Sequence, residues 1–164
     1  MRKTKRYFVE KWTNLFCAIY SIPSPILDME EVIERFGGTV AEIPGSYSLN
    51  GNIIKSGDSI IFEIAGNETP IRKKYNLACL LGHAILQLKY EIDPTEWEKA
   101  TPELIQESMF NADNLIVNRY FAEALLMPEK KVRELTDEGL NIKEMAEYFH
   151  VSKAMMTIRL KTFN

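Results

Sequence analysis

Two side chains that can bind a metal, Cys79 and His83, stand four residues apart in an apolar stretch. In a helix this spacing places both side chains on one face, where a thiolate and an imidazole can reach the same ion. Zinc hydrolases use this spacing in the motif H-E-x-x-H, in which the glutamate beside the first ligand activates water. Leu80 occupies the glutamate position here, and a leucine cannot accept a proton from water. The stretch therefore predicts a helix with the spacing of a zinc-hydrolase site but without the glutamate that activates water.

The residues around this stretch resemble the ImmA/IrrE family of metallopeptidases. That family shows an arginine, an aromatic residue and then L-A-H-E-L-G-H, and this chain has in the same order Arg72, Tyr75, Leu77, Ala78, Leu81, Gly82, His83, Ala84, Ile85 and Leu86. A second family segment is similar to E-x-x-A-N-x-F-A-x-x-L-L-M-P, and its matches are Phe121, Ala122, Leu125, Leu126, Met127 and Pro128. A third segment, A-x-x-F-x-V-S-x-x-x-M-x-x-R-L, is matched by Ala146, Phe149, Val151, Ser152, Met156, Arg159 and Leu160. In this order, the three segments make the resemblance specific over residues from about 26 to 164.

The resemblance also identifies what the chain lacks. The family's third metal ligand is the glutamate that opens the second segment, and that position is Leu115 here. Of two histidines, one base and one carboxylate ligand, only His83 remains. The resemblance therefore implies that no catalytic set is intact, and that Cys79, Leu80, His83 and Leu115 are degenerate peptidase-motif positions. Leu80 and Leu115 together predict an apolar filling where the family holds zinc.

Cys79 and His83 each have two interpretations. As a pair they are a weak alternative zinc site, because structural zinc needs four ligands and catalytic zinc needs three and a water. The other interpretation is that Cys79 is a small apolar residue in the former metal cavity. His83 is then either a hydrogen-bonded structural residue or part of a surface that binds a partner. We expect no cofactor, with zinc as the alternative.

The expected fold is α+β and mostly helical, with a zincin-like core, a small antiparallel β-sheet and a C-terminal helix-turn-helix-like helical pair. Apolar runs on both sides of Ser56-Gly57-Asp58 predict a hairpin. We expect residues 89–101 to form a polar loop. Two domains are expected, a core of residues 1–140 and a helical pair of residues 141–164 packed on it. The further predicted elements are a strand at 39–43 and helices at 6–20, after Asp28, from Pro70 to Leu88, after Thr101-Pro102, at 115–126, after Pro128, at 141–149 and at 152–163.

Composition excludes some classes of protein. An apolar fraction of 46% in 164 residues is enough for a packed core. No run of 18 uninterrupted apolar residues occurs, so we expect no membrane span or membrane partner. The start of the chain does not read as a signal peptide, and two cysteines are too few for a disulfide framework. We therefore expect a cytoplasmic protein. A net charge of −3 gives no overall indication of nucleic-acid binding.

The resemblance implies a phage or mobile-element setting, in which active relatives cleave or inactivate a helix-turn-helix repressor. We expect this chain to be a catalytically silent pseudoenzyme that binds such a repressor as an antirepressor or adaptor, through the face of Cys79, Leu80 and His83. One alternative is an active zinc metallopeptidase with an unusual Cys79/His83 site that cleaves a repressor. A second is a DNA-binding regulator that uses the C-terminal helices, with Lys153, Thr157 and Lys161 outward.

Overall fold

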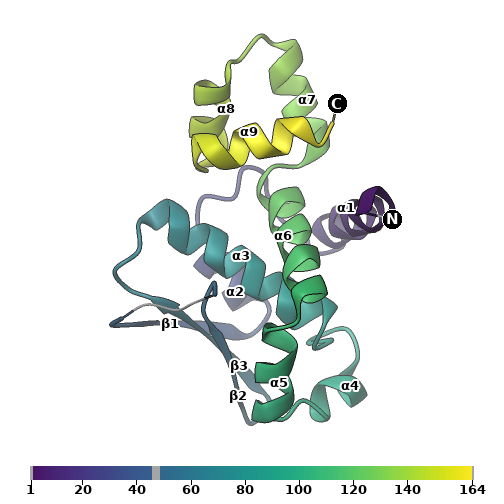
Figure 1. Cartoon of the computed structure of the whole chain (residues 1–164), viewed down its shortest axis with the longest axis vertical. Coiled ribbons are helices and arrows are strands. Elements are labelled where there is room, and N and C mark those ends of the chain that lie inside the picture. The colour runs from purple at the N-terminus through teal and green to yellow at the C-terminus, as the bar shows by residue number, and fades with distance from the viewer. Residues whose placement is uncertain (1, 46–48, 164) are drawn as a thin grey trace. The chain divides into compact units, whose positions relative to one another are not determined.

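A computed structural model describes residues 2–45 and 49–163 of the chain. Helices make up most of it and three strands form one sheet (Figure 1), so the predicted class, α+β and mostly helical, is confirmed. In chain order the elements are α1 (Arg2–Ile19), α2 (Met29–Arg35), β1 (Gly38–Ile43), β2 (Asn52–Ser56), β3 (Ser59–Ala65), α3 (Pro70–Leu86), α4 (Pro94–Glu98), α5 (Pro102–Met109), α6 (Ala112–Leu126), α7 (Glu129–Asp137), α8 (Ile142–Phe149) and α9 (Lys153–Lys161).

The chain forms two compact units. One unit comprises residues 28–119, with the sheet, α2 to α5 and the first part of α6. The other comprises residues 1–27 and 120–164, with α1, the end of α6 and α7 to α9. The sequence predicted a domain boundary at residue 140, between a core and a C-terminal helical pair. That division into domains stays a prediction. Because the motif helix and the positions of the degenerate site fall within residues 28–119, that unit positions the candidate site.

The sheet is mixed, whereas the sequence predicted an antiparallel one. Its strand order is β1-β3-β2, with β2 antiparallel and β1 parallel to β3. The β2–β3 hairpin was predicted correctly, because Gly57 at φ +61° supplies the left-handed residue that its tight turn requires. No such turn joins β1 to its neighbour. The pairing of β1 therefore depends on how α2 and the sheet pack, which local sequence does not encode.

Alternation along β3 explains how the sheet joins the core. Ile60, Phe62 and Ile64 are buried in turn along the strand, as expected for a strand with one face covered. Helices α2 and α3 pack against the sheet (Figure 1), and α5 contacts β2. The helix that carries the motif is thus fixed on the sheet.

Local signals explain the start of α3 and the helix that the sequence missed. Thr69 accepts a hydrogen bond from the Arg72 amide, and Pro70 occupies the first turn, as predicted. Residues 89–101 are not wholly a loop, because they contain α4. Asp93 accepts from the Thr95 and Glu96 amides at its start. The Asp93-Pro94 pair was the available signal for this short helix.

The C-terminal helical pair is present as predicted. Asn141 and Glu144 form a reciprocal capping box at α8. His150 ends that helix in the left-handed conformation at φ +54°, and the Ser152 side chain caps α9. Helices α8 and α9 pack on each other. Within the described residues, no helix is both long and apolar enough to cross a membrane.

Candidate functional site

The structure brings the four degenerate positions together. Cys79, Leu80 and His83 on α3 and Leu115 on α6 line one small cavity. Its other lining residues are Leu49, Asn50, Met109 and Asn118. The cavity has about 10 Å³ of space for the centre of a water molecule, which is close to the minimum for one water. The alignment that put Leu115 opposite the motif helix is therefore consistent with the fold.

Burial separates these residues from solvent. Cys79, Leu80 and His83 are each at most 3% exposed. Leu115 is half-buried. A partner docked on this surface cannot touch the three α3 side chains in this conformation. The assignment of partner binding to Cys79, Leu80 and His83 stays a prediction and requires the cavity to open.

His83 lies at the centre of a hydrogen-bonded cluster. Its Nε2 is 2.8 Å from the Ser108 hydroxyl oxygen, and its Nδ1 is 2.9 Å from the Asn118 amide nitrogen. Ser108 donates its one hydroxyl hydrogen to the Ile105 carbonyl at 2.8 Å, so it accepts from Nε2–H. An amide nitrogen only donates, so Nδ1 accepts. We call these three side chains, His83, Ser108 and Asn118, the His83 cluster; in it the imidazole is neutral, with its proton on Nε2.

Burial reinforces the neutral form of the imidazole. Desolvation lowers the pKa of His83 from 6.5 to about 4, because a buried imidazolium loses its hydration. The ring is therefore uncharged near pH 7. Asn118 contributes one further feature, a buried side-chain oxygen with no hydrogen-bond partner among the described residues. An amide oxygen left unpaired in this way costs free energy.

The side chains present do not fit the family's zinc. Zinc needs a free lone pair on the imidazole, and both ring nitrogens of His83 are engaged in hydrogen bonds. Leu80 and Leu115 supply only hydrocarbon. In the described part of the chain, no three His, Cys, Asp or Glu side chains are grouped as a metal site requires. Among the described residues, Cys79 and His83 therefore have no third His, Cys, Asp or Glu grouped with them. Whether the protein binds zinc stays a prediction.

Leu80 packs against a glycine that has no room for a side chain. A Cβ at Gly51 would lie 2.2 Å from the Glu63 carbonyl oxygen and 3.0 Å from Cδ1 of Leu80. Asn50 beside it donates to the Asn76 side chain of α3 at 3.0 Å. Gly51, the residue before β2, thus lies against Leu80. Leu80 is thus closely packed, and whether Leu80 and Leu115 fill the place of the family's zinc stays a prediction.

Sequence reasoning missed the partners of His83. Asn118 follows Leu115 by three residues, so both lie on one face of α6. That spacing was the one signal that could have identified it. Ser108 comes from α5 and has no fixed spacing to the motif, so nothing in the sequence indicated its contact with Nε2.

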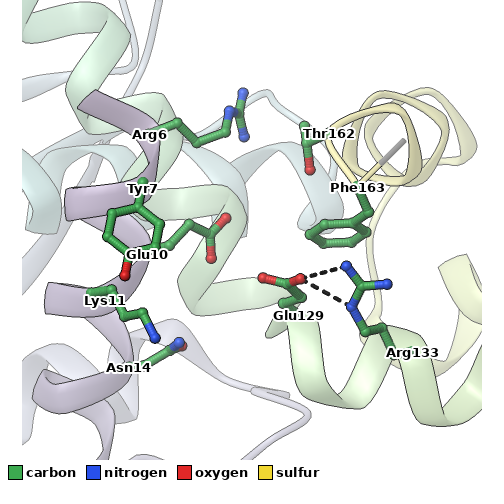
Figure 2. A pocket seen from close by; sticks show the side chains of 9 residues that line it. All are labelled: Arg6, Tyr7, Glu10, Lys11, Asn14, Glu129, Arg133, Thr162 and Phe163. Carbon is green, nitrogen blue, oxygen red and sulfur yellow. Dashed lines mark hydrogen bonds and ion pairs between the residues drawn. The ribbon is translucent and has the colours of Figure 1, made fainter. Parts of the chain in front are cut away.

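A second hollow lies in the other compact unit (Figure 2). It is an open groove of about 520 Å³ lined by Arg6, Tyr7, Glu10, Lys11, Asn14, Glu129, Arg133, Thr162 and Phe163. Glu129 accepts two hydrogen bonds from Arg133, and the Phe163 ring lies against the same guanidinium. Arg6 is paired with Glu123, and Glu10 is paired with Arg159. Most of the charges that line the groove are therefore already matched within the protein.

Helix α9 divides its residues between core and surface. Lys153 and Lys161 are exposed and Thr157 is half-buried, as expected for an outward face. Met156 and Arg159 are fully buried. This one helix therefore combines outward cations with side chains buried in the core.

Comparison with known proteins agrees with this geometry. Residues 60–161 match the Peptidase_M78 family, described as the IrrE N-terminal-like domain. A solved structure described as a Mycobacterium tuberculosis transcriptional regulator is similar over 98% of this chain, with a TM-score of 0.63 and 14% sequence identity. This chain spans about half of that regulator, 52% of its length. No curated protein matches the chain. At this identity the likeness to the regulator shows the fold alone.

Proposed function

Because the chain belongs to the family of IrrE N-terminal-like domains, we propose that it is a catalytically silent regulatory protein that acts by binding a protein partner. The observation that carries the proposal is the His83 cluster. The one remaining family ligand uses both ring nitrogens for hydrogen bonds to Ser108 and Asn118. At this position of the family's metal ligands, His83 thus packs in the interior and makes hydrogen bonds.

Loss of hydrolysis follows from what the cavity lacks. A metallopeptidase needs a metal-bound water and a base that takes its proton. Leu80 stands at the base position, and Leu115 stands at the third ligand position. Two hydrocarbon side chains at these positions support the loss of both the metal and the base. We therefore infer a pseudoenzyme that retains the family's fold.

The proposed partner is a helix-turn-helix repressor. The family resemblance implies that active relatives cleave or inactivate such repressors on phages and mobile elements. The similar solved structure is described as a transcriptional regulator, which supports a role in transcription. This chain would act as an antirepressor or adaptor, holding the repressor away from its operator while leaving it intact.

Metal content tests the silent site. Protein purified without a tag should contain no stoichiometric zinc by elemental analysis. The matched variant Cys79→His/Leu80→Glu/Leu115→Glu restores the family ligands and base, and it should bind about one equivalent of zinc. About one equivalent in the unaltered protein, lost on Cys79→Ser, would favour the active zinc peptidase with a Cys79/His83 site instead.

Partner binding is tested by pull-down from the native host, in which a helix-turn-helix repressor should be recovered with this chain. Mixing the two should release the repressor from labelled operator DNA, and intact mass measurement should find the repressor uncut. Cleavage of the repressor contradicts catalytic silence. Absence of any complex contradicts the binding role.

DNA binding through α9 is a second candidate, favoured by the exposed Lys153 and Lys161. Fluorescence anisotropy with duplex DNA separates it from the first. A binding constant that falls steeply with salt, and that drops for Lys153→Ala/Lys161→Ala while Lys130→Ala leaves it unchanged, would support this function.

A further inference from the structure

Charge is distributed unevenly between the two compact units. Residues 1–27 and 120–164 contain 12 Lys and Arg against 8 Asp and Glu, a net charge of +4. Residues 28–119 contain 8 against 15, a net charge of −7. The overall charge of −3 therefore conceals one basic and one acidic unit. Charges of opposite sign on separate surfaces favour association between surfaces that display them.

The basic unit displays an apolar helix surface. Four large side chains of α1 are between 57% and 66% exposed, and these are Tyr7, Phe8, Leu15 and Ile19. Lys11 lies among them on the same helical face, with its ammonium group over the Tyr7 ring. We call these five residues the α1 surface. Contiguous apolar side chains of this size on a surface are typical of a binding site.

The α1 surface lacks negative charge. The helix contains a single acid, Glu10, and that carboxylate is buried against the Arg159 guanidinium. Tyr7 and Lys11 also line the groove of Figure 2, so the α1 surface is continuous with a hollow. A partner for it must be apolar and acidic.

The acidic unit displays a surface with both properties. On α5, Leu104 is 51% exposed, and Phe110 at its end is 62% exposed. Glu103 and Glu107 are exposed beside them, four residues apart and therefore on the same face. We call these four residues the α5 surface. It combines two apolar side chains with two carboxylates and matches the α1 surface in chemistry.

We propose that the α1 surface binds the α5 surface of a second copy of this chain. Pairing two α1 surfaces would oppose lysines, and pairing two α5 surfaces would oppose glutamates, so like charges disfavour both symmetric alternatives. When α1 meets α5, Lys11 faces a carboxylate-bearing helix and the exposed aliphatic and aromatic side chains cover one another. Two copies that each place α1 on the α5 surface of the other form a closed dimer. Copies that make one such contact at each end form an open polymer.

A second copy fits better than a nucleic acid or a membrane. A phosphate backbone offers charge but leaves Phe8, Leu15 and Ile19 uncovered. An anionic membrane would cover α1 but would repel the carboxylates of α5 and leave Leu104 and Phe110 exposed. The second copy covers both surfaces at once, and no other molecule is needed.

Charge reversal tests the contact with purified full-length protein. Sedimentation equilibrium should find self-association that weakens as salt is raised. Lys11→Glu alone places a new carboxylate opposite that of Glu107, and Glu107→Lys alone places a new ammonium group opposite that of Lys11. Each variant should therefore self-associate at least about tenfold more weakly. Lys130→Glu, an exposed change on α7, is the control and should leave the dissociation constant unchanged.

Mixing the two variants separates a lost contact from misfolding. In the mixture, each α1 surface meets an α5 surface of opposite charge, so two samples that are monomeric alone should associate together about as tightly as the unaltered protein. Both variants should retain the circular dichroism of the unaltered chain. Three outcomes overturn the proposal: a monomer at every concentration, a mixture that stays monomeric, or a monomer that binds anionic vesicles or DNA through α1.

Discussion

Arg159 and His83 are buried polar side chains in different compact units, and the two units satisfy them differently. Arg159 is fully buried in the basic unit, where it forms an ion pair with Glu10 of α1 through both terminal nitrogens. Its Nε also donates to the Met127 carbonyl at 2.9 Å. We call Arg159, Glu10 and this carbonyl the Arg159 cluster. The His83 cluster of the acidic unit carries no charge.

The difference shows which parts of the family pattern are structural here. Arg159 belongs to the C-terminal family segment, and its guanidinium joins α9 to α1 and to the end of α6. That residue therefore has a structural role independent of any metal. Among the positions that match the family's metal ligands, by contrast, only His83 keeps the family residue, and its neighbours Ser108 and Asn118 are neutral. A charged cluster depends on every member, whereas a neutral one tolerates the loss of a partner at lower cost.

The largest effect is expected on breaking the Arg159 cluster. Arg159→Leu leaves the Glu10 carboxylate buried without a cation, which should lower the free energy of unfolding by about 3–5 kcal/mol. Urea denaturation followed by circular dichroism measures it. Adding Glu10→Leu should recover part of the loss. Arg133→Ala removes an exposed ion pair with Glu129 and should cost less than about 1 kcal/mol. Equal costs for Arg159→Leu and Arg133→Ala would refute the comparison.

The His83 cluster should make stability depend on pH. The pKa of His83 is about 4 in the folded protein, against an ordinary value of 6.5. Between these two pH values the unfolded chain therefore binds more protons than the folded protein. Stability is therefore fully present above pH 6.5 and declines as pH falls to about 4. The total contribution is about 3 kcal/mol.

A matched variant isolates this pH effect from the carboxylates. Between pH 4 and 6.5, the free energy of unfolding of His83→Gln should depend less on pH than that of the unaltered protein in the same urea titrations. If this free energy changes equally with pH in both proteins, His83 is not held neutral. A steeper loss in the unaltered protein toward pH 4 is the expected result.

Local sequence signals account for most of the fold. Caps and turn residues such as Thr69-Pro70, Asn141 and Gly57 set helix starts and the hairpin, because each satisfies backbone groups within a few residues. The parallel pairing of β1 was missed because it depends on a strand that is distant in sequence. Helix α4 was missed because five residues give no periodic pattern, although Asp93 does cap it.

The candidate site was predicted in position but not in chemistry. The resemblance indicated that Leu115 and the motif helix meet, and the cavity contains both. It gave no reason to expect Ser108 or Asn118 at the ring nitrogens, because a hydrogen bond across three helices depends on their packing. The neutral state of His83 follows only from those contacts and from burial.

The smallest effect should come from the neutral cluster itself. Asn118→Leu removes the donor to Nδ1 of His83, which leaves a buried acceptor unpaired and should cost about 1–3 kcal/mol in urea denaturation. The cost is limited because the same change removes the unpaired amide oxygen. Leu115→Met in the same cavity nearly conserves volume and is the control, with a cost below about 1.5 kcal/mol.

His83→Leu/Asn118→Leu should cost less than the sum of the single changes, because the two side chains are hydrogen-bonded partners. Strict additivity would mean that the pair contributes nothing, and the contrast with the Arg159 cluster would then rest on charge alone.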